Sequence, residues 1–236
     1  GHFSDRLLSM ISEALENKEQ VILFQNRRGF SPVVECTTCG VAPQCPNCDV
    51  SLTFHKYRNE LKCHYCNYQR AMPNNCAACG SNTLDTKGFG TEQIELELKE
   101  IFPTYKIGRM DLDTTRGKHG YQKIIGAFEA QEIDVLVGTQ MLSKGLDFEN
   151  VSLVGILNAD NMLNFPDFRA HERSYDMMVQ VSGRAGRSKK QGNVAIQTFN
   201  PYHQILQQVS TTNYAEMYKE QLQERWQYQY PPYFRL

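Results

Sequence analysis

Residues 36–80, CTTCGVAPQCPNCDVSLTFHKYRNELKCHYCNYQRAMPNNCAACG, hold all eight cysteines of this chain. The cysteines form four Cys-x-x-Cys pairs, which are Cys36/Cys39, Cys45/Cys48, Cys63/Cys66 and Cys76/Cys79. Two thiolates separated by two residues can bind one tetrahedral metal ion from a tight turn, and two such turns complete a structural zinc site. The stretch therefore predicts a small module with two zinc sites, each made of four cysteines.

Disulfide bonds are the main alternative to zinc. Disulfide-rich domains are usually short secreted chains whose cysteines are spread along the whole sequence. Here the cysteines occupy one part of a 236-residue chain, and the sequence before them does not read as a secretion signal. We therefore expect reduced thiolates, two Zn²⁺ per chain and a cytoplasmic location. His55 and His64 lie in the module, but four thiolates already saturate each zinc, so neither is expected to be a ligand.

The residue after each pair supports metal-binding turns. Gly40 and Gly80 directly follow a second cysteine, where such a turn often needs a positive φ. Asp49 and Asn67 hold the same place after the other two pairs, and both residue types tolerate that conformation.

The four pairs can combine into two sites in three ways. The inner pairs bracket residues 50–54 and 61–62, which look like the short hairpin of a zinc ribbon. We therefore favour a nested arrangement over a sequential or an interleaved one. One site is then Cys45, Cys48, Cys63 and Cys66, and the other is Cys36, Cys39, Cys76 and Cys79. A module this small has little apolar core, so metal binding would supply much of its folding free energy.

Composition bounds the remaining possibilities. Hydrophobic residues make up 41% of the chain, which is compatible with a globular core. We expect no membrane span, because no run of about 18 apolar residues occurs. The formal net charge is −1, so any binding to nucleic acid would need a local basic patch. Lys56, Arg58, Lys62 and Arg70 give the cysteine module a basic cast.

Outside the module, apolar periodicity predicts alternating helices and strands. Expected helices span residues 5–17, 91–102, 121–130 and 170–182, with a polar helix from about 202; expected strands span 21–24, 106–110, 133–137, 151–157 and 194–199. This alternation implies a parallel sheet with helices on both faces. The expected domains are residues 1–34 with 81–215, the zinc module at 35–80, and a helix and linker at 216–236 leading toward a further domain.

Three other features each allow more than one interpretation. Trp226, Tyr228 and Tyr230 either stack on bases or pack on a further domain. Asp111 and Asp113 follow a strand, and they bind metal, act as acid and base or, as we favour, cap the following turn. Residues 164–169 either contact unwound DNA strands or have a packing role within the protein. The chain begins with Gly1-His2 and ends at Arg235-Leu236, and we expect it to be a piece of a longer protein.

The sequence Gln180-Val-Ser-Gly-Arg184-Ala-Gly-Arg187 places two arginines three residues apart after a predicted helix. Guanidinium groups so placed can meet the oxygens of a γ-phosphoryl group bound by another domain. A surface basic turn that continues to Lys189 and Lys190 is equally compatible with the charges. The chain has no G-x-x-x-x-G-K-[ST] loop and no Asp-Glu pair, so we expect it not to hydrolyse a nucleotide by itself.

This stretch resembles motif VI of superfamily 2 helicases, and residues 137–148, VGTQMLSKGLDF, resemble motif V. Together with the nested cysteines and with residues 26–32 and 88–92, they make the chain similar to the PriA family of bacterial replication-restart DNA helicases. The resemblance covers nearly the whole chain. It implies the second RecA-like lobe of the helicase motor, an α/β fold interrupted by the zinc module.

The resemblance also implies roles for individual residues. Arg184 and Arg187 match the arginine fingers that act on ATP bound to the first lobe, and Gln180 matches a polar residue facing the cleft. Gly145 and Asp147 match positions near the nucleotide. Thr139 and Gln140 follow a strand end where DNA phosphate can bind. Arg27 and Arg28 leave the first strand at the same edge, so they either contact DNA backbone or pair with acids such as Glu35.

For the full-length protein the resemblance implies an ATP- and Mg²⁺-dependent 3′→5′ DNA helicase that remodels stalled forks and starts primosome assembly. The implied partners are forks, single-stranded DNA, other primosome proteins and the single-stranded-DNA-binding protein, and we expect a monomer. The first alternative is a non-catalytic zinc-ribbon adaptor, in which both arginines are dispensable. The second is a redox module with exchangeable thiols, which two tightly held zinc ions would exclude.

Overall fold

A computed structural model describes residues 2–25, 33–55, 58–85, 90–111, 114–115, 119–139, 148–185 and 192–235. The helices are α1 Asp5–Glu16, α2 Thr91–Ile101, α3 Gly120–Glu129, α4 Asp160–Leu163, α5 Ala170–Ser182, α6 Gln204–Thr211 and α7 Tyr214–Gln227. The strands are β1 Gln20–Phe24, β2 Glu35–Cys36, β3 Thr53–His55, β4 Glu60–Lys62, β5 Gln69–Ala71, β6 Leu84–Asp85, β7 Ile107–Met110, β8 Val135–Gly138, β9 Val151–Ile156 and β10 Asn193–Ile196.

The chain divides into two compact units. The first contains Gly1–Arg28, Phe89–Ala159 and Met177–Gln197, and the second contains Gly29–Gly88, Asp160–Asp176 and Thr198–Leu236. The domain boundaries expected from the sequence, at residues 35, 81 and 216, remain a prediction.

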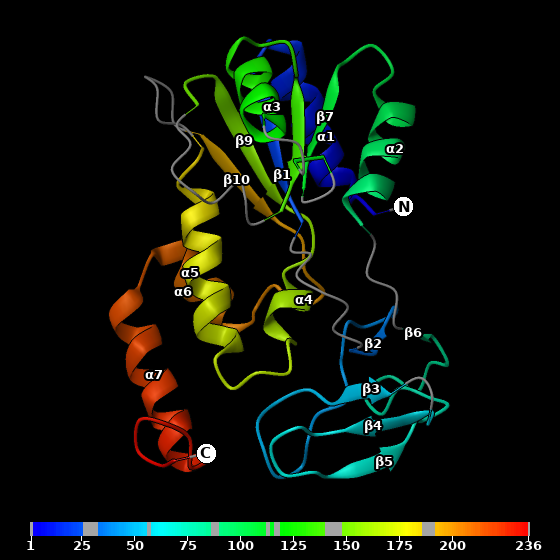
Figure 1. Cartoon of the computed structure of the whole chain (residues 1–236), viewed down its shortest axis with the longest axis vertical. Coiled ribbons are helices and arrows are strands. Elements are labelled where there is room, and N and C mark those ends of the chain that lie inside the picture. Colours follow the sequence, from blue (N-terminus) through cyan, green and yellow to red (C-terminus); the bar gives the residue numbers. More distant parts are fainter. Residues whose placement is uncertain are drawn as a thin grey trace. The chain divides into compact units, whose positions relative to one another are not determined.

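The first unit is built on a five-stranded sheet in the order β10-β9-β1-β8-β7 (Figure 1). All neighbouring strands of this sheet run parallel. β1 lies at the centre, and all five of its residues are buried because helices cover both faces of the sheet. The predicted fold class, an α/β parallel sheet layered on both faces, is confirmed.

Helix α1 shows how local sequence produces one of these covering helices. Ser4 precedes the helix in an extended conformation, and its side-chain oxygen accepts a hydrogen bond from the N–H of Leu7 at 3.3 Å. Leu7, Ile11, Ala14 and Leu15 then recur on one face and are buried. They form one apolar cluster with residues of α2 and with Val21 and Leu23 of β1. Successive residues of β1 point to opposite faces, so the side chains of Ile22 and Phe24 are buried on the other face of the sheet.

The second unit holds the cysteine module. The inner hairpin is present, because β3 pairs antiparallel with β4, and β5 adds a third strand that the sequence did not predict. β2 and β6 pair antiparallel and join the two ends of the module. The buried members of a small apolar cluster are Val34, Cys45, Val50, Leu52, Leu61 and Cys63, so two of these six are candidate metal ligands.

No helix in the described part of the chain is long and apolar enough to cross a membrane.

Candidate metal centres and motor residues

The structure brings the eight cysteines together as two groups of four. One group is Cys36, Cys39, Cys76 and Cys79, and the other is Cys45, Cys48, Cys63 and Cys66; within each group the sulfur atoms all lie within 4.8 Å of one another. We call these the outer site and the inner site. They are the two sites of the nested arrangement that the sequence favoured. In both, two ligands are buried, one is half-buried and one is exposed.

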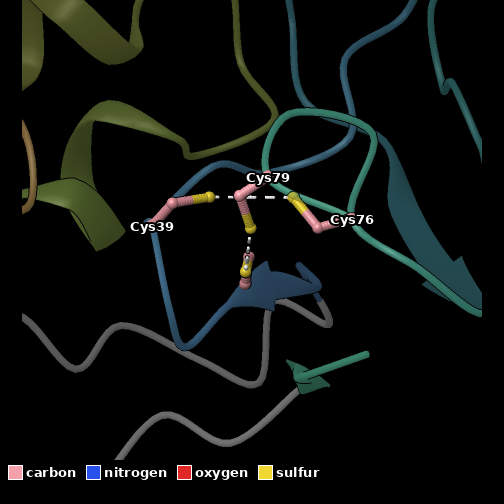
Figure 2. A group of neighbouring side chains, drawn as sticks. Cys39, Cys76 and Cys79 are labelled. Atoms are coloured by element: carbon pink, nitrogen blue, oxygen red, sulfur yellow. Dashed lines mark hydrogen bonds between the residues drawn. The ribbon is translucent and has the colours of Figure 1, made fainter. Parts of the chain in front are cut away.

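The sulfur separations fit a tetrahedral metal ion. Sγ–Sγ distances are 3.6 Å for Cys36–Cys79, 3.7 Å for Cys39–Cys76 and 3.5 Å for Cys45–Cys66. Four sulfurs at the Zn–S distance of about 2.3 Å would lie ~3.8 Å apart in a tetrahedron. A disulfide needs about 2.05 Å, and all eight cysteines are free thiols here. Figure 2 shows Cys39, Cys76 and Cys79 of the outer site with their sulfurs converging on one point. The donor set therefore fits zinc.

The turns that carry the ligands have the predicted geometry with one exception. Gly40 and Gly80 have φ values of 73° and 75°, and Asn67 has a φ of 61°. Asp49 is not among the positive-φ residues of the described chain. The turn after Cys48 is tighter, because the N–H of Val50 donates to the carbonyl of Cys48. The expectation for Asp49 was therefore wrong.

Hydrogen-bond donors surround the outer-site sulfurs. The hydroxyl of Ser81, which contributes most, and the N–H groups of Cys39 and Thr38 lower the pKa of Cys36 to about 5. Such a thiol is deprotonated at neutral pH, which is the form that binds metal. At the inner site, the N–H of Tyr68 contributes most to lowering the pKa of Cys66 to about 6.

The two histidines of the module belong to neither sulfur group. His55 and His64 lie against each other, with ring centroids 5.3 Å apart. Neither is in a metal-binding group of the described residues, as expected from the saturation of both sites by cysteine.

The outer site is tied to the segment that follows β9. Asn164 donates its amide to the carbonyl of Gly40 and to Glu35 Oε1, both at 3.3 Å. Burial raises the pKa of Glu35 to about 7. Asp160 accepts hydrogen bonds from the Thr198 hydroxyl at 2.9 Å and from the N–H of Phe199 at 3.0 Å. The sequence analysis did not identify Asn164 as a contact of the metal module.

An aromatic cluster makes a second contact with the module. Tyr65, between the inner ligands Cys63 and Cys66, lies edge-on to Phe168 and Tyr230, and the last two rings stack with centroids 4.8 Å apart. Tyr230 is only 5% exposed. The sequence suggested two roles for Tyr230, stacking on bases or packing on a further domain. The structure corrects this prediction, because the Tyr230 ring packs within this chain. Trp226 is 65% exposed. Phe168 packs against the apolar cluster of the module, which supports the packing interpretation of residues 164–169.

The candidate motor residues fall partly outside the described part of the chain. Arg27, Arg28, Gln140, Gly145, Asp147 and Arg187 lie outside the described residues. Thr139 directly follows β8, is 9% exposed, and donates its N–H to the carbonyl of Met110 at 3.3 Å. It therefore stands at the carboxyl edge of the parallel sheet, where α/β folds bind ligands.

Gln180 and Arg184 occupy the end of α5 and the turn after it. Gln180 is exposed on the last turn of α5, and the N–H of Arg184 donates to the carbonyl of Val181 at 3.0 Å. Helix α5 thus ends at Ser182, where the sequence predicted, and Arg184 follows two residues later. The roles of these residues remain predictions.

Asp111 caps a turn, as favoured from the sequence. Its Oδ1 accepts the N–H of Thr114 at 3.0 Å, and its Oδ2 accepts the hydroxyl of Thr91 at 2.6 Å. Asp113 lies outside the described residues.

Comparisons with known proteins cover both parts of the chain. Residues 45–70 match the family model of the PriA DNA helicase Cys-rich region domain, and residues 80–189 match that of the helicase conserved C-terminal domain. The chain is 44% identical over 234 residues to the replication restart protein PriA of Bacillus subtilis, which covers 99% of this chain and 29% of that protein. It is 43% identical over 238 residues to PriA of Synechocystis sp., which again covers 99% of this chain and 29% of that protein.

The chain therefore spans less than a third of the length of these two relatives. Among solved structures, S. cerevisiae Dbp5 bound to RNA and ADP BeF3 aligns with a TM-score of 0.43 and 14% identity, covering 91% of this chain and 41% of that one.

Proposed function

Because this chain belongs to the PriA family of replication restart proteins, we propose that it forms the second motor lobe of an ATP-dependent DNA helicase. The observation that carries the proposal is the combination of a parallel α/β sheet, a complete motif VI sequence at the end of α5, and a module with two four-cysteine sites. Each of the three is compatible with other proteins, but the family that combines them is a helicase family.

In this proposal Arg184 and Arg187 act on ATP that the first lobe binds. As γ-phosphate is transferred to water, negative charge spreads over its oxygens, and a guanidinium group brought across the cleft stabilises that charge. Gln180, on the exposed face of the last turn of α5, orients groups in the cleft. Gly145 and Asp147 lie near the nucleotide, and ATP reaches the site with Mg²⁺.

The carboxyl edge of the sheet holds DNA in this proposal. Thr139 places a hydroxyl at the end of β8, and Gln140, Arg27 and Arg28 extend the same edge along the sequence. ATP-driven closure of the two lobes would then move the strand one step per cycle, in the 3′→5′ direction. The zinc module engages the fork, single-stranded DNA or other primosome proteins.

The first test is DNA-stimulated ATP hydrolysis by the full-length protein carrying Arg187→Ala. Arginine fingers contribute on the order of 10³–10⁵ in rate in other phosphoryl-transfer enzymes. We expect a fall of several hundred-fold or more, with DNA affinity and zinc content unchanged. Lys189→Ala and Lys190→Ala are matched controls, because they remove a cation from the same stretch and should leave the rate near that of the wild type.

The opposite result would favour the adaptor interpretation. If Arg187→Ala hydrolyses ATP at a near-normal rate, the motif VI arginine is dispensable and the chain acts through its zinc module alone. Direction is tested separately, with duplexes that carry either a 3′ or a 5′ single-stranded tail. Unwinding of the 5′-tailed duplex alone would contradict the proposed polarity.

A further inference from the structure

The hydroxyl of Ser81 lies between two ligands from opposite ends of the module. Its Oγ is 3.1 Å from Cys36 Sγ and 3.2 Å from Cys79 Sγ. The backbone of Ser81 is fixed, because its carbonyl accepts the N–H of Cys76 at 2.7 Å. One side chain therefore reaches sulfur atoms of two Cys-x-x-Cys pairs that only meet in the folded outer site.

Two more hydroxyls continue from Ser81 to the surface. Thr83 Oγ1 is 3.1 Å from Ser81 Oγ and 3.6 Å from Cys36 Sγ. Thr38 Oγ1 is 2.7 Å from Thr83 Oγ1 and is exposed. Thr38, Thr83 and Ser81 thus form a continuous chain of hydroxyls, which we call the hydroxyl chain, and it ends on the outer-site sulfurs.

The chemistry of the groups sets the direction of its protons. A metal-bound thiolate can only accept a hydrogen bond, whereas each hydroxyl can donate one and accept others. Ser81 therefore donates to sulfur, which leaves its oxygen to accept from Thr83, and Thr83 in turn accepts from Thr38. Donors aligned in this way polarise one another, so the last hydrogen bond is strengthened by the two before it.

A zinc site made of four cysteines has a clear need for such donors. Four thiolates carry more negative charge than one Zn²⁺ neutralises, and hydrogen bonds to sulfur spread the excess charge. Partners that orient metal ligands without touching the metal typically change metal affinity when they are removed. At the inner site the corresponding side-chain donor is the amide of Asn47, which is 3.6 Å from Cys66 Sγ and reaches that one sulfur.

We propose that Ser81 is a positioning residue of the outer metal site, and that Thr83 and Thr38 orient its proton toward the thiolates of Cys36 and Cys79. The site closes the base of the module, where β2 and β6 pair Cys36 with Leu84. Ser81 therefore stabilises both the metal and the junction at which the two ends of the module meet.

The test is zinc retention by the zinc-loaded chain in the presence of a chelating dye. Alkylation of the freed cysteines followed by mass spectrometry assigns each lost zinc to the outer or the inner site. We expect Ser81→Ala to weaken zinc binding at the outer site by roughly 10-fold or more, within the 10–100-fold range for such partners, and to leave the inner site unchanged. The inner site is thus an internal control for folding.

Conservative variants separate the hydroxyl from the shape of the side chain. Thr83→Val keeps the shape, removes the hydroxyl, and should weaken the outer site less than Ser81→Ala does. Ser81→Thr and Thr83→Ser keep a hydroxyl and should retain zinc like the wild type. Thr37→Val is the matched control, because the Thr37 hydroxyl is bonded to the carbonyl of Thr83 and touches no sulfur.

Cobalt substitution gives a readout that a purely structural role would not change. Loss of a hydrogen bond raises the energy of the thiolate lone pair, so the sulfur-to-cobalt charge-transfer band of Ser81→Ala should move to lower energy. An unchanged band together with unchanged outer-site zinc retention would overturn the proposal. Equal loss of zinc from both sites would also overturn it, since that result indicates general unfolding of the module.

Discussion

The α-carbon of Gly40 lies directly against Phe199. A methyl group at Gly40 would come within 2.6 Å of Phe199 Cβ and Cδ2, which is closer than nonbonded carbon atoms approach. Gly40 also has a φ of 73° and accepts the amide of Asn164. The outer metal-binding turn is therefore fitted closely to the chain around it.

Gly80 is the equivalent residue of the other outer turn, and it provides a matched comparison. Its φ is 75°, but a methyl group there meets nothing within 4 Å. We expect Gly80→Ala to cost about 1–2 kcal/mol of unfolding free energy from backbone strain alone. Gly40→Ala should cost about 1–3 kcal/mol more, because it adds overpacking against Phe199. Denaturant unfolding of both variants measures the difference, and equal losses would show that the contact with Phe199 contributes nothing.

The stacked pair Phe168–Tyr230 gives a second prediction. Tyr230→Ala removes a ring that is 5% exposed and contacts two other aromatic rings, so we expect a loss of about 3 kcal/mol or more. Tyr233→Ala, three residues along, removes a ring that is 49% exposed and should change stability by less than about 0.5 kcal/mol. Thermal or urea unfolding distinguishes the two. A small effect at Tyr230 would mean that the C-terminal segment does not pack on Tyr65 and Phe168 in solution.

His203 predicts a pH dependence of stability. Burial, together with nearby His171, lowers the pKa of His203 to about 4, while Glu224 acts in the opposite direction. Between pH 6.5 and 4 the unfolded chain binds a proton at this residue that the folded chain does not bind. The contribution of His203 to stability should therefore fall as the pH falls through this window, and it should be constant above it.

The variant His203→Asn tests this assignment. Asparagine keeps an acceptor for the N–H of Ile205, which His203 Nδ1 accepts at 3.2 Å at the start of α6, but it does not titrate. We expect the decline of unfolding free energy between pH 6.5 and 4 to become shallower. Parallel curves for the wild type and His203→Asn would exclude His203 as the source.

Metal removal gives a fourth prediction. The apolar cluster of the module has six buried members, two of which are ligands, whereas the parallel sheet has an apolar cluster of its own. A chelator should therefore unfold the module and leave the sheet folded. Hydrogen exchange would show loss of protection in β3, β4 and β5 and retained protection in β1, β8 and β9. Loss of protection throughout would mean that the sheet depends on the metal.

Sequence patterns predicted the elements whose stability is local. The helix at 170–182 was placed at its observed bounds, and α1 begins at the predicted residue 5, because apolar spacing is a property of neighbouring residues. The nested cysteine groups followed from the short hairpin between the inner pairs. In contrast, β5 has three exposed residues, so it shows none of the alternation that marks a half-buried strand.

Contacts between distant segments were not predictable from these patterns. Tyr65, Phe168 and Tyr230 come from three separate parts of the chain, and no spacing rule relates them. The strand expected at 194–199 ends at Ile196, and two residues after Gln197 the N–H of Phe199 bonds the side chain of Asp160 at 3.0 Å. Ser81 gave no signal, since serine after a Cys-x-x-Cys-Gly turn has many possible partners.

The central position of β1 has a consequence for how the protein is made. Val21 of β1 pairs with Val135 of β8, and Phe24 pairs with Ile156 of β9, so both neighbours are synthesised long after β1 leaves the ribosome. The metal module lies between them in the sequence, and its strand pairings β2–β6, β3–β4 and β4–β5 all fall within residues 35–85. During translation the module can therefore acquire its zinc and fold while the apolar strand before it still lacks partners. During that interval β1 lacks the two neighbouring strands that cover its edges in the folded sheet, so an apolar strand with unpaired backbone groups is exposed to aggregation.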